Sequence, residues 1–213
     1  KRLGDLIGGE APKFAVRVKG AGPNLHEWRP WTATMLGQIT GSGAGWPGAG
    51  FDMKEGAPDL GYLKSTDRNT QKGKAEELFA HTRGRNFWEV SGLCWFGTAD
   101  RVAGGFKDAV AALAGTTGWK DLTLEECLTA GERVWNMERI FNIRHGLTPE
   151  DDYKNVGPRF LEPVPDGQYQ GFTMAKWLPG MVFDFYRVCG WDEKTGKPYL
   201  DTLRRLGIEE FAV

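Results

Sequence analysis

Residues 123–145 carry the strongest helix pattern in this chain of 213 residues. Thr123 and Glu126 have the spacing of a capping box, which begins a helix by satisfying two free backbone N–H groups. Gly146 follows at the position where a glycine commonly ends a helix. Apolar or small residues recur along one face of the segment: Leu124, Cys127, Leu128, Gly131, Val134, Trp135, Ile140 and Phe141. A helix of this length must bury such a face, so we expect it to organise a mainly α-helical fold.

Shorter helix patterns occur in other parts of the chain. They cover residues 30–40, 73–83, 99–114, 179–190 and 201–206. Leu3, Leu6 and Ile7 are helically spaced, so residues 1–15 are predicted to be the tail of a preceding helical domain. The weak alternation of residues 14–20 predicts a short strand. Several prolines in residues 147–171 predict extended, irregular chain there.

The charge of the chain is balanced, with 27 basic and 28 acidic residues and a formal net charge of -1. This balance gives no electrostatic reason to expect binding to nucleic acid or to an anionic membrane. No apolar run approaches the roughly 18 residues that a membrane helix needs. The three cysteines, Cys94, Cys127 and Cys189, are too few and too widely spaced for a disulfide framework, so a reducing, cytoplasmic location is expected. Cys127 and Cys189 are predicted to be core residues.

Familiar catalytic signatures do not occur in the sequence. His26, His81 and His145 are scattered, and there is no H-E-x-x-H, G-x-S-x-G or Walker motif. Residues 43–48 satisfy G-x-G-x-x-G, but this motif indicates a dinucleotide site only between a strand and a helix. Here a helix pattern precedes it and Pro47 lies within it. We therefore predict a loop that binds no nicotinamide or flavin dinucleotide.

Residues 87–96 place a cysteine in an aromatic environment. Cys94 is followed directly by Trp95 and Phe96, and a carboxylate, Glu89, precedes it. A thiol in such an apolar wall is either an inert, buried side chain or one ligand of a soft metal centre. The residue types alone favour the inert interpretation, because free cysteine is among the most buried residue types.

Two stretches resemble the tungsten-containing aldehyde:ferredoxin oxidoreductase family. Residues 89–95, Glu-Val-Ser-Gly-Leu-Cys-Trp, resemble the family's Asp-x-x-Gly-Leu-Cys motif, with Glu89 in place of the aspartate. Residues 132–146 resemble its C-terminal signature, in which a helix ends on Arg-x-Phe-Asn-x-Arg-x-Gly. Shorter matches follow in the family's order at residues 151–152, 158–161, 190–192 and 203–207. The resemblance runs from about Val16 to the C-terminus.

The resemblance implies an irregular multi-helix C-terminal domain with long loops, formed by residues 16–213 and contributing to a pterin and iron–sulfur site. The implied cofactors are tungsten (or molybdenum) held by two pterins and a nearby [4Fe-4S] cluster. The residues at motif positions would contact them: Glu89, Gly92, Leu93, Cys94 and Trp95. Cys94 is the implied metal ligand, and the other three cluster ligands are expected from the N-terminal part of the same enzyme. The chain is accordingly expected to be a C-terminal piece of a longer polypeptide.

The implied reaction is oxidation of a small-molecule aldehyde to a carboxylate. Ferredoxin or an electron-transfer subunit would accept the electrons, in a homo-oligomer or a multi-subunit complex. The family's aldehyde oxidoreductases have an active-site histidine in this domain, but the matching residues 45–48 contain none. Either His26 or His81 substitutes for it, or the substrate differs. One alternative is therefore the active-site subunit of a tungsten-dependent aromatic acyl-CoA (benzoyl-CoA type) reductase. A second is a non-catalytic helical module that has lost the cofactor.

Overall fold

The computed structural model describes residues 2–22, 27–41, 57–61, 67–93 and 105–213. Within these ranges the chain is mainly helical and forms isolated β-bridges but no strand, so the predicted fold class is confirmed. The α-helices are α1 (Arg2–Ile7), α2 (Ala11–Phe14), α3 (Thr32–Thr40), α4 (Lys74–Val90), α6 (Gly105–Thr117), α7 (Leu124–Arg144), α8 (Pro149–Tyr153), α9 (Pro158–Leu161), α10 (Gly180–Cys189) and α11 (Leu200–Leu206). The 3-10 helices are η1 (Pro58–Leu60), η2 (Gly167–Tyr169), η3 (Ala175–Trp177) and η4 (Glu209–Phe211).

Helix α7 begins where the sequence predicts. Thr123 Oγ1 accepts a hydrogen bond from the Glu126 backbone N–H at 3.2 Å, and the Glu126 carboxylate accepts one from the Thr123 N–H at 2.8 Å, which completes the capping box. Five predicted core positions of α7 are buried: Cys127, Leu128, Gly131, Trp135 and Ile140. The prediction for Phe141 is wrong, because its side chain is 61% exposed. Successive helical residues point about 100° apart, so the residue after buried Ile140 turns towards solvent.

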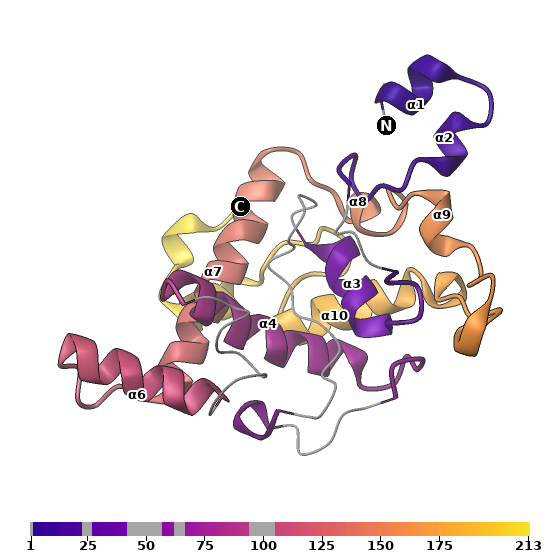
Figure 1. Cartoon of the computed structure of the whole chain (residues 1–213). Helices are drawn as coiled ribbons and strands as arrows, with labels where there is room; N and C mark the ends of the chain where they lie inside the picture. Colours follow the sequence, from indigo (N-terminus) through magenta and orange to yellow (C-terminus); the bar gives the residue numbers. More distant parts are fainter. Residues whose placement is uncertain (1, 23–26, 42–56, 62–66, 94–104) are drawn as a thin grey trace.

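Helices α4 and α7 pack against each other at the centre of the molecule (Figure 1). Gly131 makes their close approach possible. A Cβ at this position would lie 1.9 Å from the backbone oxygen of Arg83 and 2.8 Å from the backbone nitrogen of Phe87. Helix α4 runs beyond the predicted residues 73–83, since Phe87 and Trp88 are buried and extend its packed face. This extension brings Glu89, the first residue of the candidate motif, onto the last turn of α4.

Helices α3 and α10 also pack on α4 and complete the main core. Every residue of α3 is buried. Trp135 of α7 stacks on Trp191 with ring centroids 5.7 Å apart, and Phe185 of α10 adjoins both rings. Cys189, at the end of α10, is buried as predicted. Gly190 follows with φ +70° and ends the helix in the left-handed conformation that glycine adopts without strain.

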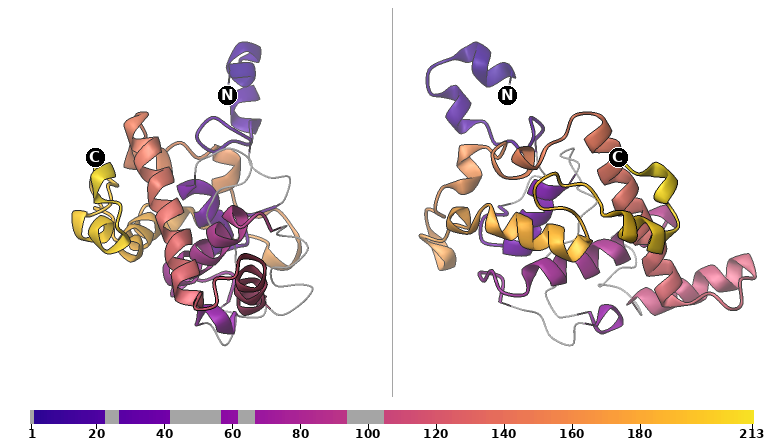
Figure 2. Two further views of the ribbon diagram at one scale, coloured as in Figure 1. Left: turned by 90° about the vertical axis from the view of Figure 1, so that its left-hand side faces the viewer. Right: turned by 180° about the vertical axis from the view of Figure 1, so that it is seen from behind.

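Helix α6 extends from the body of the molecule and leads into α7 (Figure 2). Its first turn packs on α4, where the Phe106 ring lies edge-on to Trp88 with centroids 5.6 Å apart. Cys127 belongs to the same apolar cluster and is only 3% exposed, as predicted for a core residue. The helix ends at Thr117, three residues after the predicted end. Residues 99–104 of the predicted helix lie outside the described residues.

The first two helices stand apart from the body (Figures 1 and 2). Helix α1 confirms the helical spacing of Leu3, Leu6 and Ile7, whose side chains are 68% to 74% exposed. The predicted strand over residues 14–20 is wrong. Helix α2 takes the start of that segment, because Pro12 in its first turn has a fixed φ suited to a helix.

The rest of that segment turns back on itself instead of extending. Val18 makes only isolated bridges, to Ala21 and to Val156. Lys19 and Gly20 have positive φ values of 49° and 82°, which place the Val18 N–H 2.9 Å from the Ala21 carbonyl oxygen. This geometry forms a tight turn, which a weak alternation of apolar and polar residues does not reveal.

Residues 147–171 contain more helix than predicted. Pro149 and Pro158 each stand at the start of a short helix, α8 and α9. At that position the missing N–H of proline is not needed and its fixed φ favours the helix. The prolines therefore begin helical turns here, and the prediction of a wholly irregular segment is wrong.

Candidate functional site

The motif that begins at Glu89 lies at the C-terminal end of α4. Ser91 ends the helix, and Gly92 follows with φ +73°, a conformation that glycine adopts without strain. A Cβ on Gly92 would meet no described atom within 4 Å, so the space around this residue is open on the side of the described chain. Leu93 packs partly buried against the cluster that contains Trp88. Cys94 and Trp95, the remaining predicted cofactor contacts, lie outside the described residues.

Glu89 is held in place by Arg85, one helical turn earlier. Its Oε1 accepts hydrogen bonds from Arg85 Nε at 2.8 Å and from Arg85 Nη2 at 2.7 Å. The Glu89 side chain is 43% exposed, whereas the Arg85 side chain is 2% exposed. A buried guanidinium thus anchors a carboxylate whose second oxygen remains available at the surface. A charge-assisted pair of this kind fixes the direction of the carboxylate more firmly than an exposed pair would.

A second carboxyl group, Glu138 of α7, faces the same end of α4. Its Oε2 atom is buried and accepts no hydrogen bond from the described residues. Burial raises the pKa of Glu138, the nearby charge of Glu89 raises it further, and Arg85 lowers it. Sequence reasoning missed Glu138. The available signal was a carboxylate on a buried helix, one residue before Arg139 and three residues after Trp135.

Helix α4 carries a stripe of buried charged or titratable side chains that leads to this end. Lys74, Glu77, His81 and Arg85 recur at helical spacing and each is at most 5% exposed. Lys74 Nζ donates to Glu77 Oε2 at 3.0 Å. Burial, assisted by the charge of Arg85, lowers the pKa of His81 to about 3. His81 is therefore neutral at physiological pH.

The other two histidines are His26 and His145. His26 lies outside the described residues. His145 is exposed at the end of α7, where its Nδ1 lies 2.7 Å from the Phe141 carbonyl oxygen and its ring lies against the Phe141 ring. Of the histidines that the structure places, only His81 lies on α4, about two helical turns before Glu89.

A second buried polar network joins α7 to distant segments. Arg139 donates to Asp152 Oδ2 at 2.7 Å, to the Tyr186 hydroxyl at 2.7 Å and to the Gly196 carbonyl at 2.9 Å. Lys19 pairs with the other oxygen of Asp152. Burial raises the pKa of Tyr186, and lowers that of Lys19 against the opposing attraction of Asp152. The network crosslinks the turn at Lys19, helix α8 and helix α10 to α7, so its role is to hold the core together.

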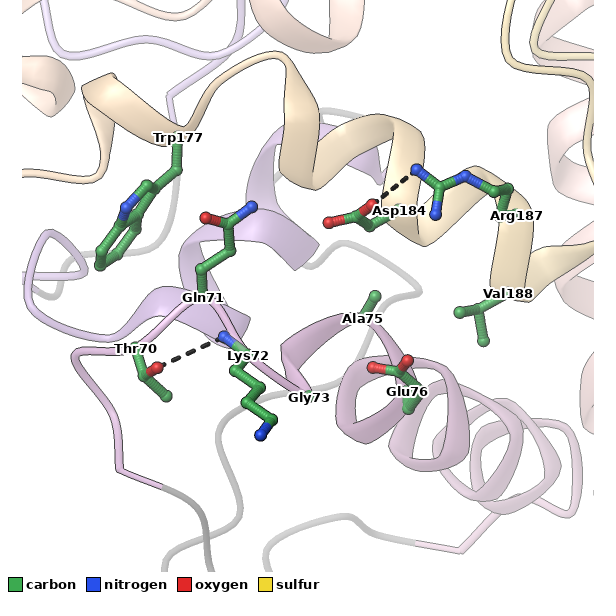
Figure 3. A pocket seen from close by; sticks show the side chains of 10 residues that line it. All are labelled: Thr70, Gln71, Lys72, Gly73, Ala75, Glu76, Trp177, Asp184, Arg187 and Val188. Carbon is green, nitrogen blue, oxygen red and sulfur yellow. Dashed lines mark hydrogen bonds and ion pairs between the residues drawn. The ribbon is translucent and has the colours of Figure 1, made fainter.

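A groove of about 690 Å³ lies at the opposite end of α4, between its first turn and α10 (Figure 3). The Gln71 side chain extends between Trp177 and Asp184 (Figure 3). Arg187 is bound to Asp184 at 2.7 Å and to Glu193 at 2.6 Å, so its charge is already neutralised. A helix the length of α4 spans roughly 25 Å, so this groove is remote from Glu89.

The described residues contain neither a metal-binding cluster nor a membrane-spanning helix. No cluster of three or more His, Cys, Asp or Glu side chains placed to hold a metal ion is present among them. None of their helices is both long and apolar enough to cross a membrane.

The described residues form a helical fold in which α4 ends on an anchored carboxylate and a left-handed glycine. Comparison with known proteins defines the class further. The family model for aldehyde ferredoxin oxidoreductase, domains 2 and 3, matches residues 1–208. The chain therefore belongs to the aldehyde ferredoxin oxidoreductase family, as its motifs predict.

Individual relatives agree with this assignment. The tungsten-containing aldehyde ferredoxin oxidoreductase of Pyrococcus furiosus is 41% identical to this chain over 124 residues. The proteins of the same name from Thermococcus kodakarensis and Pyrococcus abyssi are 37% and 36% identical over matches of the same length. Each match covers 58% of this chain and 19% of the relative, so the chain corresponds to part of a larger enzyme.

Proposed function

We propose that this chain is the C-terminal helical part of a tungsten-dependent oxidoreductase that oxidises an aldehyde to a carboxylate. Residues 16–213 would form the domain that completes the cofactor site, and residues 1–15 the tail of a preceding helical domain. The observation that carries the proposal is the family match over residues 1–208, and the motif that begins at Glu89 on the last turn of α4 supports it. The partners would be the N-terminal part of the same enzyme and ferredoxin or an electron-transfer subunit, in a cytoplasmic homo-oligomer or multi-subunit complex.

The residues at the end of α4 fit a cofactor rich in N–H donors, as a pterin is. Glu89 offers a carboxylate that Arg85 orients, and Gly92 leaves open space beside it. Glu138 offers a buried oxygen that accepts no hydrogen bond from the rest of the described chain. Glutamate in place of aspartate at position 89 lengthens the side chain by one methylene, and the two hydrogen bonds from Arg85 fix where its carboxylate lies.

Within the proposed site, Glu89, Gly92, Leu93, Cys94 and Trp95 would hold the pterin, and the Cys94 thiolate would bind a [4Fe-4S] cluster. Once bound, the tungsten–pterin centre and the cluster supply the redox chemistry, and the protein orients and tunes them. Leu93 would close the apolar side of the site.

A second candidate is reduction of an aromatic acyl-CoA by an active-site subunit of the same family. Residues 45–48 contain no histidine, which favours this candidate, and burial lowers the pKa of His81, so His81 is unprotonated near neutral pH. This histidine is then a poor substitute for the proton-donating histidine that residues 45–48 lack. The two candidates share the cofactor site and differ in the substrate.

The experiment is metal analysis of the anaerobically purified full-length enzyme that contains this chain, followed by an activity panel. We expect both tungsten and iron to be present. Aldehyde-dependent reduction of an electron acceptor would support the first candidate, and turnover of aromatic acyl-CoA would support the second. Protein that contains neither metal after expression with tungstate and iron would contradict both and favour the non-catalytic helical module.

A further inference from the structure

Glu138 is a half-buried carboxyl group with unusual surroundings. Its Oε2 has no hydrogen-bond donor among the described residues. An isolated ionised carboxylate is costly in such a place, and a group in this position lowers the cost by binding a proton. The other buried carboxylates of α7 and its neighbours differ. Glu132 pairs with Arg205 and Arg83, and Asp152 pairs with Arg139 and Lys19.

The charged groups that face Glu138 are few. Helix α4 contributes Arg85 and Glu89, and both Arg85 hydrogen bonds in this cluster go to Glu89. On α7, the helix of Glu138, the Arg139 guanidinium donates its hydrogen bonds to Asp152, to the Tyr186 hydroxyl and to the Gly196 carbonyl oxygen. Helix α3 contributes Thr40, which lines a small cavity with Glu138, and has no titratable residue. Within this cluster the Arg85 guanidinium is hydrogen-bonded to Glu89, and Glu138 Oε2 accepts no hydrogen bond from the described residues.

We propose that Glu138 of α7 is a proton-binding residue beside the Arg85–Glu89 ion pair at the C-terminal end of α4. The proton comes from water and adds to a Glu138 carboxylate oxygen, so no other bond changes. Burial and the neighbouring Glu89 carboxylate both act in this direction, and Arg85 opposes them.

A role for the Glu138 proton in the reaction follows from its location, and this step rests on the proposed function. Oxidation of an aldehyde with water releases protons as well as electrons, and a carboxyl group beside the cofactor site can exchange them. A protonated carboxyl group also has one O–H donor in addition to its acceptor oxygen. Glu138 would therefore present both kinds of hydrogen-bonding group to a ligand.

The experiment is infrared titration of the purified protein carrying ¹³C-carboxyl glutamate, in which protonated and ionised carboxyl groups absorb separately. We expect a protonated glutamate at pH 7 that disappears in Glu138→Gln. Glu150→Gln, which removes an exposed carboxyl group on α8, is the matched control and should keep the signal. In Glu89→Gln the loss of a neighbouring negative charge should move the Glu138 titration to lower pH.

The result that overturns the proposal is a pH 7 signal that is the same in Glu138→Gln and in the wild type. A Glu138 titration that does not move in Glu89→Gln would overturn the coupling. Glutamine has nearly the same shape as protonated glutamate, and a circular dichroism spectrum identical to wild type would show that each variant is folded. Because the titration does not depend on bound tungsten, its outcome is separate from the metal analysis that tests the proposed function.

Discussion

Gly131 of α7 and Arg83 of α4 are in direct backbone contact: a Cβ on Gly131 would lie 1.9 Å from the Arg83 carbonyl oxygen. Real Cβ atoms essentially never approach another atom so closely. The contact lies at the packing of the two central helices, upstream of Glu89 on α4 and of Glu138 on α7. The distance between these helices therefore sets the geometry of the Glu89, Arg85 and Glu138 cluster.

Gly131→Ala should strongly destabilise the protein. The obstacle is backbone rather than a flexible side chain, so α4 and α7 must move apart. Overpacked cores typically lose about 1–3 kcal/mol, and we expect a loss at the top of that range or above it. Urea unfolding followed by circular dichroism measures the change.

The matched control is Gly115→Ala in α6, where a Cβ would meet nothing within 4 Å. Alanine should stabilise this exposed helical position by up to about 1 kcal/mol. Equal effects at the two glycines would show that the close contact has no energetic consequence.

Trp135→Ala should cost about 3–5 kcal/mol of unfolding free energy, the usual range for truncation of a large buried aromatic side chain. The Trp135 side chain is 3% exposed and stacks on Trp191. Phe141→Ala on the same helix is the control, because the Phe141 side chain is 61% exposed. This substitution should change the free energy of unfolding by at most about 0.5 kcal/mol. A loss below about 1 kcal/mol for Trp135→Ala would contradict its assignment to the core.

The sequence predicts those features whose interacting residues lie within a few positions of each other along the chain. Thr123 and Glu126 are three residues apart and complete their capping box without help from the rest of the chain. The glycine that follows α10, Gly190, is equally local. Phe141 was misplaced because apolar character alone does not say where the core ends along a helix, and the neighbouring chain leaves it uncovered.

The candidate site was only partly predictable, because its contacts join separate helices. Residues 89–95 could be singled out from their own motif. The approach of Glu138 to Glu89, and the pairing of Asp152 with Arg139, depend on how α7 packs on α4 and α8. Charged side chains on a buried helical stripe are the available signal, but they do not identify their partners.

Acid should destabilise the protein through His81. Folding lowers the pKa of His81 from 6.5 to about 3, so the folded state excludes a proton that the unfolded state binds. This contribution to stability is fully present above pH 6.5 and is lost as the pH falls towards 3. At about 1.4 kcal/mol per pKa unit it is worth up to about 5 kcal/mol.

Melting temperatures of the wild type and of His81→Gln, measured from pH 7.5 down to pH 4, test this effect. Glutamine cannot take up the proton, so the acid-induced loss should be smaller in the variant. His145→Gln, at the exposed end of α7, should follow the wild type. Parallel curves for wild type and His81→Gln would contradict the assignment of the acid sensitivity to His81.

Cys94→Ser should remove or degrade the proposed iron–sulfur cluster. Such clusters take four protein ligands, usually thiolates, and serine replaces a soft sulfur with a hard oxygen of similar size. Burial raises the pKa of the Cys127 thiol, and it raises the pKa of the Cys189 thiol further. Neither environment therefore favours the thiolate that iron needs. Both side chains also pack inside apolar clusters. Cys127→Ser and Cys189→Ser should therefore keep the cluster, even where they lower stability.

The measurement is the iron content and the reduced-state EPR spectrum of the three variants, purified anaerobically beside the wild type. We expect the cluster signal to be lost or altered in Cys94→Ser alone, together with electron transfer to the acceptor. A wild-type signal in Cys94→Ser would remove Cys94 from the ligand set. Loss of the signal in a folded Cys127→Ser or Cys189→Ser protein would place a ligand in the core, contrary to the burial of both thiols.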